Sequence, residues 1–393
     1  MTPRTGLIGA VAGLAAGALL LTACSSSGGS GGSGGSTGSN SGSNSSGGSS
    51  SSGSGSSKYA ALQTAVTQLE QRPTTIGITD PIKGKIPAGK KVAFIQCGSP
   101  ICSTMGNDLT AAGAILHWNI QKINAGLTAE TIKAAWDQAV SSKVDAVITS
   151  GTPRTLFESE LAQLKAANVP VIDLTTADGP GNGLTQVYGG PDQYSQQGKN
   201  MADYMLVNSG DTTVKELSVT ISAYPNITLV ANGLNAELKG QCSSCTTSDL
   251  DVPATSIGSD LPTRITSYLS SHPDINWVYV GFSDMVTGLP AALNSAGLGK
   301  VKIVTLSTNP TIATYMKNGQ NLMMATGFDT DEMMWRSADY LARIWTNSST
   351  AQNVDPKTLP SWFVTKDNLP STTENFPYVA DYRAQYEKLW TSS

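Results

Sequence analysis

AVITSGTPRTLFESELAQLKAANVPVIDL, residues 146–174, places two short apolar runs on either side of a segment with helical spacing. Ala146–Thr149 and Pro170–Leu174 are predicted strands, because each is a brief, mainly apolar run of the kind found in buried strands. Leu156–Ala167 is the predicted helix between them. Strands that alternate with helices in this way indicate a parallel sheet covered by helices on both faces.

The same alternation extends in both directions and falls into two series. The first runs from a strand at Lys91–Ile95 to a short strand at Gln186–Tyr188, and the second begins with a helix at Gln193–Asn208. The alternation is too long for one open sheet and lacks the eight equal units of a barrel. We therefore expect an α/β protein with two doubly wound, Rossmann-like lobes. Three further predicted elements are a helix at Lys58–Glu70, a strand at Trp362–Val364 and a helix at Tyr378–Trp390.

The N-terminus has the organisation of a secretory signal peptide. A single cationic side chain, Arg4, precedes an uncharged run at 6–23. This run is diluted by glycine and is borderline in length for a membrane span, which needs about 20 apolar residues. It ends in LTAC at 21–24, which resembles the lipobox of bacterial lipoproteins and implies that residues 1–23 are removed and Cys24 is acylated. An uncleaved signal anchor with an incidental thiol is the alternative.

Residues 25–57 contain only Ser, Gly, Asn and Thr. A segment without charge, aromatic residues or apolar periodicity cannot offset the entropy of ordering, so residues 24–57 are predicted to be a lipid-anchored, disordered tether. A Gly/Ser coil of about 33 residues has a root-mean-square span of roughly 30 Å. We therefore expect the remaining chain to be held near the extracytoplasmic face of the bacterial membrane.

Charge and cysteine usage narrow the possible partners. The net charge is −4 at pH 7, and no basic block occurs, so no nucleic-acid partner is expected. Of the five cysteines, Cys24 accounts for the odd one. An oxidising compartment favours a disulfide in each of the two local pairs, Cys97 with Cys102 and Cys242 with Cys245.

Redox chemistry and metal binding are the other roles open to these cysteines. A redox motif at 242–245 is disfavoured because no strand-to-helix turn follows it, and a reactive thiol needs a helix N-terminus or a nearby cation. Zinc requires four ligands, and the two histidines, His117 and His272, are not at ligand spacing. We expect no metal and no cofactor.

Two strand phrases are characteristic, VPVID at 169–173 and VYVGFSDM at 278–285. Together with the lipobox, the tether and the two lobes, they resemble the type I periplasmic binding proteins, most nearly the ribose/galactose-type branch that serves sugar ABC importers. The resemblance covers about residues 90–366. It implies a receptor that closes around one small-molecule solute and delivers it to an ABC permease, whose ATPase is a separate chain. We also expect the protein to act as a monomer.

The resemblance further implies a hinge of three segments, expected near Gly189–Asp192, Ala325–Phe328 and Pro356–Ser361. These crossings set the expected boundaries. The expected division is 58–89 for an N-terminal helix and lead-in, 90–190 plus 328–355 for lobe 1, and 191–327 plus 361–393 for lobe 2.

Ligands of parallel α/β sheets bind outside the carboxyl ends of the strands, so residues directly after the strands are the candidate ligand-binding residues. Core packing is the alternative for the aromatic candidates, and a helix N-cap is the alternative for Asp284. The candidates are Ser99, Ile101, Thr149, Ser150, Thr175, Thr176, Tyr224, Asn226, Phe282, Asp284, Ser307 and Phe328.

Several candidates depart from the pattern of the sugar-binding branch. Thr175 and Thr176 stand where that branch has Asp-Arg, and Phe328 stands where it has the hinge glutamine. Phe282 and Ser307 replace an asparagine and an aspartate. We therefore expect a pocket of hydroxyl, amide and aromatic groups with few charges. The family implies a small neutral sugar or sugar-like solute, and a neutral apolar or aromatic-ring solute is the alternative.

An enzyme and a ligand sensor are the competing functional classes. Ser/His/Asp hydrolysis requires a histidine aligned with a nucleophile, whereas His117 and His272 are expected at the surface at helix ends. No nucleophile elbow, phosphate-binding loop or HExxH run occurs, so we expect no enzymatic activity. A sensor that docks on a membrane receptor needs the same closure and is the alternative to an importer.

Overall fold

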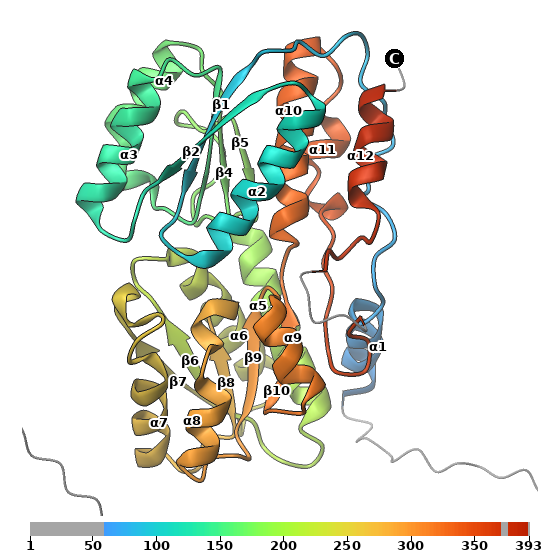
Figure 1. The fold of residues 1–393 in the computed structure, drawn as a ribbon. Helices are drawn as coiled ribbons and strands as arrows, with labels where there is room; N and C mark the ends of the chain where they lie inside the picture. Colours follow the sequence, from blue (N-terminus) through green and yellow to red (C-terminus); the bar gives the residue numbers. More distant parts are fainter. Residues whose placement is uncertain (1–58, 371–375, 392–393) are drawn as a thin grey trace, which may run out of the picture. The chain divides into compact units, whose positions relative to one another are not determined.

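The computed structural model describes residues 59–370 and 376–391. The predicted signal peptide at 1–23, the lipid-anchor Cys24 and the tether up to residue 57 lie outside the described residues. Within the described ranges, no helix is both long and apolar enough to cross a membrane. The described chain forms two α/β lobes, each with a parallel sheet, which confirms the predicted fold class (Figure 1).

Lobe 1 is built on a five-stranded parallel sheet covered by helices on both faces. Its elements are β1 (Lys91–Gln96), α2 (Pro100–Ile115), β2 (Asn119–Asn124), α3 (Ala129–Ser141), β3 (Ala146–Ser150), α4 (Glu158–Ala166), β4 (Val171–Leu174), β5 (Gln186–Tyr188), α10 (Thr330–Thr346) and α11 (Ala351–Val354). The strand order is β2-β1-β3-β4-β5. In β1, Val92 and Phe94 join the core shared with α2 and α10, whereas Ala93 and Ile95 join a separate core with α3 and α4. Burial on both faces explains why the interior of β1, residues 92–95, is continuously apolar.

Lobe 2 repeats this architecture. Its elements are α5 (Pro191–Asn208), β6 (Lys215–Thr220), α6 (Pro225–Gln241), β7 (Thr246–Asp251), α7 (Leu261–Ser271), β8 (Trp277–Val280), α8 (Leu289–Ser295), β9 (Lys302–Leu306), α9 (Pro310–Lys317) and β10 (Leu322–Thr326), in the strand order β10-β9-β8-β6-β7. Two glycines bring α5 and α6 close together. A Cβ on Gly198 would lie 2.0 Å from the carbonyl oxygen of Val230, and a Cβ on Gly233 would lie 2.1 Å from that of Ser195.

Three short segments cross between the lobes close to the predicted hinge positions. Gly189 and Gly190 join β5 to α5, and residues 327–329 join β10 to α10. The third crossing follows the single 3₁₀ turn at Pro356–Thr358, after which Ser361 pairs with Phe328 across a β-bridge. We call these three crossings the hinge segments.

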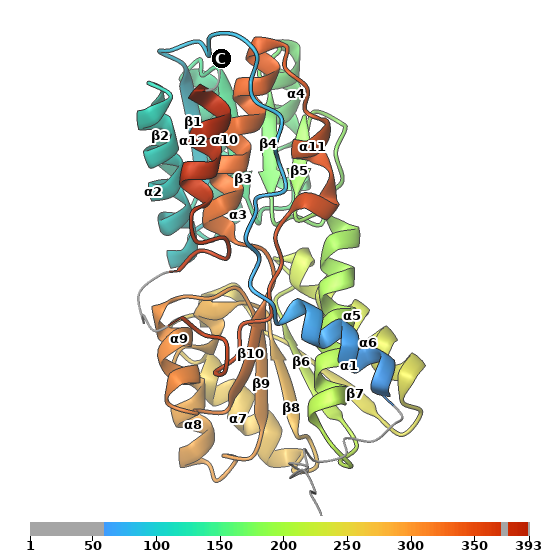
Figure 2. The same ribbon diagram turned by 90° about the vertical axis from the view of Figure 1, so that its right-hand side faces the viewer.

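The N-terminal part of the described chain makes a further connection. The helix α1 (Ala60–Leu69) packs on α5 in lobe 2, and the Phe363 amide donates a hydrogen bond to the Leu69 carbonyl at 2.8 Å. The lead-in then contacts lobe 1, where Arg336 Nη2 donates to the Ile76 carbonyl at 2.6 Å. Figure 2 shows this segment running along both lobes.

The C-terminus corrects one predicted boundary. Residues 361–393 were assigned to lobe 2, but the C-terminal helix α12 (Tyr382–Thr391) packs on α10 in lobe 1. The Trp390 and Trp335 rings stack with their centroids 5.3 Å apart, and Trp390 Nε1 donates to Asp339 Oδ1 at 3.0 Å. The assignment was wrong for this helix because its aromatic side chains pack against α10.

The predicted strand at 362–364 is reduced to isolated bridges in lobe 2, where Val364 pairs with Ala325 of β10.

Candidate functional site

A cavity lies between the lobes at the carboxyl ends of both sheets, where the strand-end rule predicted a site. Its volume is about 90 Å³. We call it the inner cavity. Of the predicted residues, those that line it are Ser99, Ile101, Ser150, Thr175, Tyr224, Asn226, Phe282, Ser307 and Phe328.

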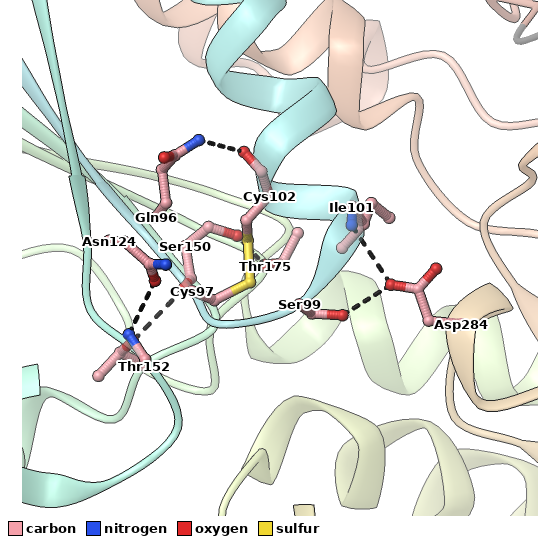
Figure 3. Close-up of a disulfide and its surroundings, with 11 residues drawn as sticks. Gln96, Cys97, Ser99, Ile101, Cys102, Asn124, Ser150, Thr152, Thr175 and Asp284 are labelled. Carbon is pink, nitrogen blue, oxygen red and sulfur yellow. Dashed lines mark hydrogen bonds between the residues drawn. A yellow bond between two sulfur atoms is a disulfide. The ribbon is translucent and has the colours of Figure 1, made fainter. Parts of the chain in front are cut away.

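The loop after β1 is fixed by a disulfide at the edge of the inner cavity. Cys97 and Cys102 are bonded, as predicted, and both line the cavity (Figure 3). Gln96 Nε2 donates to the Cys102 carbonyl at 3.0 Å, and Ser99 is the N-cap residue of α2. The loop is therefore held in place at both ends. The second predicted disulfide, Cys242–Cys245, is also present and lies between α6 and β7.

Each lobe has a pair of hydrogen-bonded hydroxyls at the carboxyl ends of its strands. In lobe 1, Ser150 Oγ and Thr175 Oγ1 are 2.8 Å apart, and in lobe 2, Ser283 Oγ and Ser307 Oγ are 3.3 Å apart. Thr175 and Ser307 have φ angles of 54° and 55°, in the left-handed region. A β-branched residue is rarely found there, and such conformations concentrate at functional sites.

Aromatic rings form much of the remaining wall. The rings of Tyr224 and Phe282 meet edge to face with centroids 6.3 Å apart, and those of Tyr194 and Phe328 with centroids 5.9 Å apart. Burial raises the pKa of Tyr194, and hydrogen bonding to Asn226 and Thr175 offsets only part of that rise. The Tyr194 hydroxyl is therefore neutral and can donate a hydrogen bond into the cavity.

Asp284 occupies a different position from the one expected. It does not cap its own short 3₁₀ helix at Ser283–Val286, so the N-cap interpretation is wrong. Instead its carboxylate crosses the cleft to α2: Ser99 Oγ donates to Asp284 Oδ2 at 2.6 Å, and the Ile101 amide donates to the same oxygen at 3.3 Å (Figure 3). A carboxylate at a helix N-terminus is favoured by the free amides and the helix dipole. Asp284 thus joins the two lobes.

Two predicted residues lie behind the cavity wall. Thr149 is fully buried in β3, and within the described residues its Oγ1 has no hydrogen-bond partner. Thr176 is also buried, and its Oγ1 accepts a hydrogen bond from the Asp178 amide at 3.1 Å. Neither residue lines the inner cavity, so their prediction as cavity residues is corrected.

The sequence did not indicate several residues that line the cavity. Tyr194 and Ile227 come from the first turns of α5 and α6, Met105 from α2, and Leu306 from the end of β9. Tyr194 follows the Gly189–Gly190 crossing, and that position was the available signal. Met105 carried no comparable signal, because only the packing of α2 brings it to the cavity.

A second cavity adjoins the inner cavity and has a volume of about 530 Å³. We call it the outer cavity. It is lined by Asp284, by the segment Ser307–Thr311 and by the start of α10. No lysine or arginine lines either cavity within the described residues. The described ranges also contain no group of three or more His, Cys, Asp or Glu side chains placed to hold a metal ion.

Comparison with known proteins gives a consistent result. The model of a family described as the periplasmic binding protein domain matches residues 91–349. A glucose-galactose binding protein from Geobacillus stearothermophilus shares 16% identity at a TM-score of 0.63, covering 72% of this chain and 99% of that one. A carbohydrate transporter from Acidothermus cellulolyticus, in complex with myo-inositol, shares 18% identity at a TM-score of 0.61, covering 77% and 99%.

A solute-binding protein from Agrobacterium vitis with bound allitol shares 15% identity at a TM-score of 0.59, covering 72% of this chain and 97% of that one. These structures share the fold of this chain. A search of curated protein sequences gave no match.

Proposed function

The chain belongs to the periplasmic binding protein domain family, and on this premise we propose that it captures a small uncharged solute for an ABC importer. The observation that carries the proposal is the inner cavity, which draws its walls from the strand ends of both lobes. The Ser99–Asp284 hydrogen bond joins the two lobes beside it. Closure of two lobes around a solute creates a surface that a permease can recognise.

The character of the cavity supports an uncharged solute. Hydroxyls, one amide and four aromatic rings line it, and no charged side chain does so within the described residues. A buried charge on a solute would need a partner of opposite charge, and its desolvation would otherwise be costly. The relatives bound to myo-inositol and allitol hold uncharged polyols. We therefore propose a sugar-like or polyol-like group as the default ligand.

The cellular setting follows from the N-terminal sequence. We propose that residues 1–23 are a signal peptide and that Cys24 carries the lipid that holds the protein at the extracytoplasmic face of the membrane. The permease and its ATPase would be separate partner chains, and the receptor would act as a monomer without enzymatic activity. A sensor that docks on a membrane receptor is the second candidate, because it would use the same closure.

Thermal-shift measurements on the purified chain test the proposal. Uncharged sugars and polyols are expected to raise the melting temperature, since a ligand at 100 times its Kd stabilises the native state by about 2.7 kcal/mol. Phe282→Ala should weaken the response by removing a cavity wall. Tyr268→Ala is the matched control, because Tyr268 is half-buried on α7 against His272 and does not line either cavity.

Stabilisation by charged amino acids or peptides alone would contradict the proposal, and turnover of a solute would indicate an enzyme.

A further inference from the structure

The inner and outer cavities form one continuous space. Ile101, Ser307, Phe328 and Thr330 line both of them. A single water needs about 10–15 Å³ of such a cavity. The inner cavity, at about 90 Å³, therefore has room for one ring. The outer cavity, at about 530 Å³, is several times larger. A solute that filled only the inner cavity would leave most of this space to water.

Three serine hydroxyls of the inner cavity already have partners within the protein. Ser150 bonds Thr175, Ser307 bonds Ser283, and Ser99 donates to Asp284. A sugar placed among these groups would have to compete for hydroxyls that already have partners. The Asn226 amide, which bonds the Tyr194 hydroxyl, keeps further hydrogen-bonding capacity for one polar substituent.

The rest of the inner wall is apolar. Met105 and Leu306 are almost fully buried, and the aromatic rings of Phe282 and Phe328 face the same space as the Ile227 side chain. Burial of an apolar ring against such a wall is favourable because it removes apolar surface from water. The inner cavity therefore suits an apolar or weakly polar ring better than a ring covered with hydroxyls.

The outer cavity has the opposite character. The hydroxyls of Thr104, Thr287, Thr308 and Thr311 line it, and within the described residues none of them bonds another protein group through its side chain. These threonines are partly exposed or exposed, so their hydroxyls are hydrated and free to bind a solute. Each hydroxyl can both donate and accept a hydrogen bond, which suits the donors and acceptors of a polyhydroxylated molecule.

The charges of the outer cavity disfavour an anionic solute. Asp284, Asp329 and Asp331 line it, and no cationic side chain does so within the described residues. A phosphorylated or carboxylated sugar would therefore find no cationic side chain to pair with in the described lining.

We propose that the solute is a glycoside-type molecule whose apolar ring occupies the inner cavity and whose neutral polyhydroxylated part occupies the outer cavity. The contrast between the largely apolar wall of the inner cavity and the exposed threonine hydroxyls of the outer cavity carries this inference. It rests on the proposed function as a receptor for an uncharged solute and names the class of that solute.

Isothermal titration calorimetry on the full chain tests the inference with compounds that share fragments. The probes are phenyl β-D-glucopyranoside and phenyl β-D-galactopyranoside, the parent sugars D-glucose and D-galactose, phenol, and the cation phenethylamine. At least one glycoside is expected to bind tenfold or more tightly than both its sugar and phenol, because only the glycoside fills both cavities.

Variants assign each fragment to its cavity. Thr308→Val combined with Thr311→Val should weaken the binding of the glycoside about tenfold and leave that of phenol unchanged. Met105→Ala should weaken the binding of both. Thr263→Val on α7 is the matched control, because Thr263 is exposed and lines neither cavity.

The possible failures are distinguishable. A sugar that binds as tightly as its phenyl glycoside would overturn the two-cavity inference and leave the proposed function intact. Tighter binding of phenethylamine than of any glycoside would assign the outer cavity to a cation and overturn the inference. Absence of binding by every uncharged compound would refute both the inference and the proposed function.

Discussion

Replacing Asp284 with alanine should shift the protein toward an open conformation. The Asp284 carboxylate in lobe 2 accepts hydrogen bonds from Ser99 Oγ at 2.6 Å and from the Ile101 amide at 3.3 Å, and both donors belong to lobe 1. Asn309 Nδ2 holds the other carboxylate oxygen at 3.3 Å from within lobe 2. The alanine variant removes the bonds between the lobes and leaves both sheets intact.

The magnitude follows from the geometry. A hydrogen bond to a charged group contributes about 1.5–3 kcal/mol, but Asp284 is half-buried and the open form regains water. About 1 kcal/mol for each bond, or about 2 kcal/mol together, is therefore the expected loss. Since about 1.4 kcal/mol is a factor of ten, the ratio of closed to open protein should fall roughly 30-fold.

Small-angle X-ray scattering without ligand reports the open fraction through the radius of gyration, and calorimetry reports the affinity. A double-mutant cycle with Ser99→Ala isolates the Ser99–Asp284 term, for which we expect a coupling of about 1 kcal/mol. Asp137→Ala removes an exposed pair with Lys133 on α3 and serves as the control. If Asp284→Ala leaves the scattering curve unchanged, the carboxylate does not hold the lobes together.

Three further changes test other parts of the structure. Thr175→Gly should keep the free energy of unfolding within about 1 kcal/mol of wild type, because glycine tolerates a φ of 54°. The affinity for the solute should fall about tenfold because the hydroxyl is lost. A large drop in Tm would contradict the expected stability. Burial raises the pKa of Glu216 from its ordinary 4.5 to about 8, so the free energy of unfolding is highest below pH about 4.5 and falls as the pH rises toward 8. Glu216→Gln should therefore stabilise the protein by roughly 3 kcal/mol at pH 7 and hardly at all at pH 4. Denaturant unfolding at both pH values would reveal this difference. Gly198→Ala should destabilise by about 3 kcal/mol because its Cβ would lie 2.0 Å from the Val230 carbonyl oxygen. A Tm equal to that of the Gly240→Ala control, a helical glycine of α6 with open space around it, would contradict the close packing of α5 on α6.

The alternation of strands and helices was predictable because the central strands, such as β1, β3 and β8, are short and mainly apolar runs. The phrases at 169–173 and 278–285 indicated the family, which the match over 91–349 confirms. Helix starts were placed too late for one physical reason. Pro100, Pro191 and Pro225 each stand at the first turn of a helix, yet these helices were predicted to begin two to four residues later, at Thr104, Gln193 and Ile227. Proline suits that position because its missing amide would have no partner there.

The candidate site was predictable as far as parallel strands impose it. Residues such as Ser150 and Ser307 reach the cavity because they directly follow buried strands. Asp284 illustrates what the sequence alone could not provide. Its partners, Ser99 and Ile101, are distant in the chain, and only the approach of the two lobes brings them together. The position of α12 on lobe 1 likewise depends on a surface of α10 that the sequence pattern does not single out.

Besides the hinge segments, two parts of the chain link the lobes: the N-terminal lead-in and the segment before α12. Their contacts limit how the lobes can move. Arg72 of the lead-in donates to the carbonyls of Pro377 and Tyr378 at 2.7 and 3.0 Å, and its guanidinium lies 5.3 Å from the centre of the Trp362 ring. The Tyr378 amide in turn donates to Asp329, which directly follows Phe328 of the inner cavity.

Both outer connections are therefore bonded to each other and to a hinge segment. Opening by rotation about the hinge segments can keep these bonds only if the lead-in and the C-terminal segment move with them. A wide separation of the lobes would have to break the contacts of Arg72, whereas a small rotation would not. The bonding of Arg72 and Asp329 thus favours a narrow opening, and access of the solute would depend mainly on release of Asp284 at the mouth of the cleft.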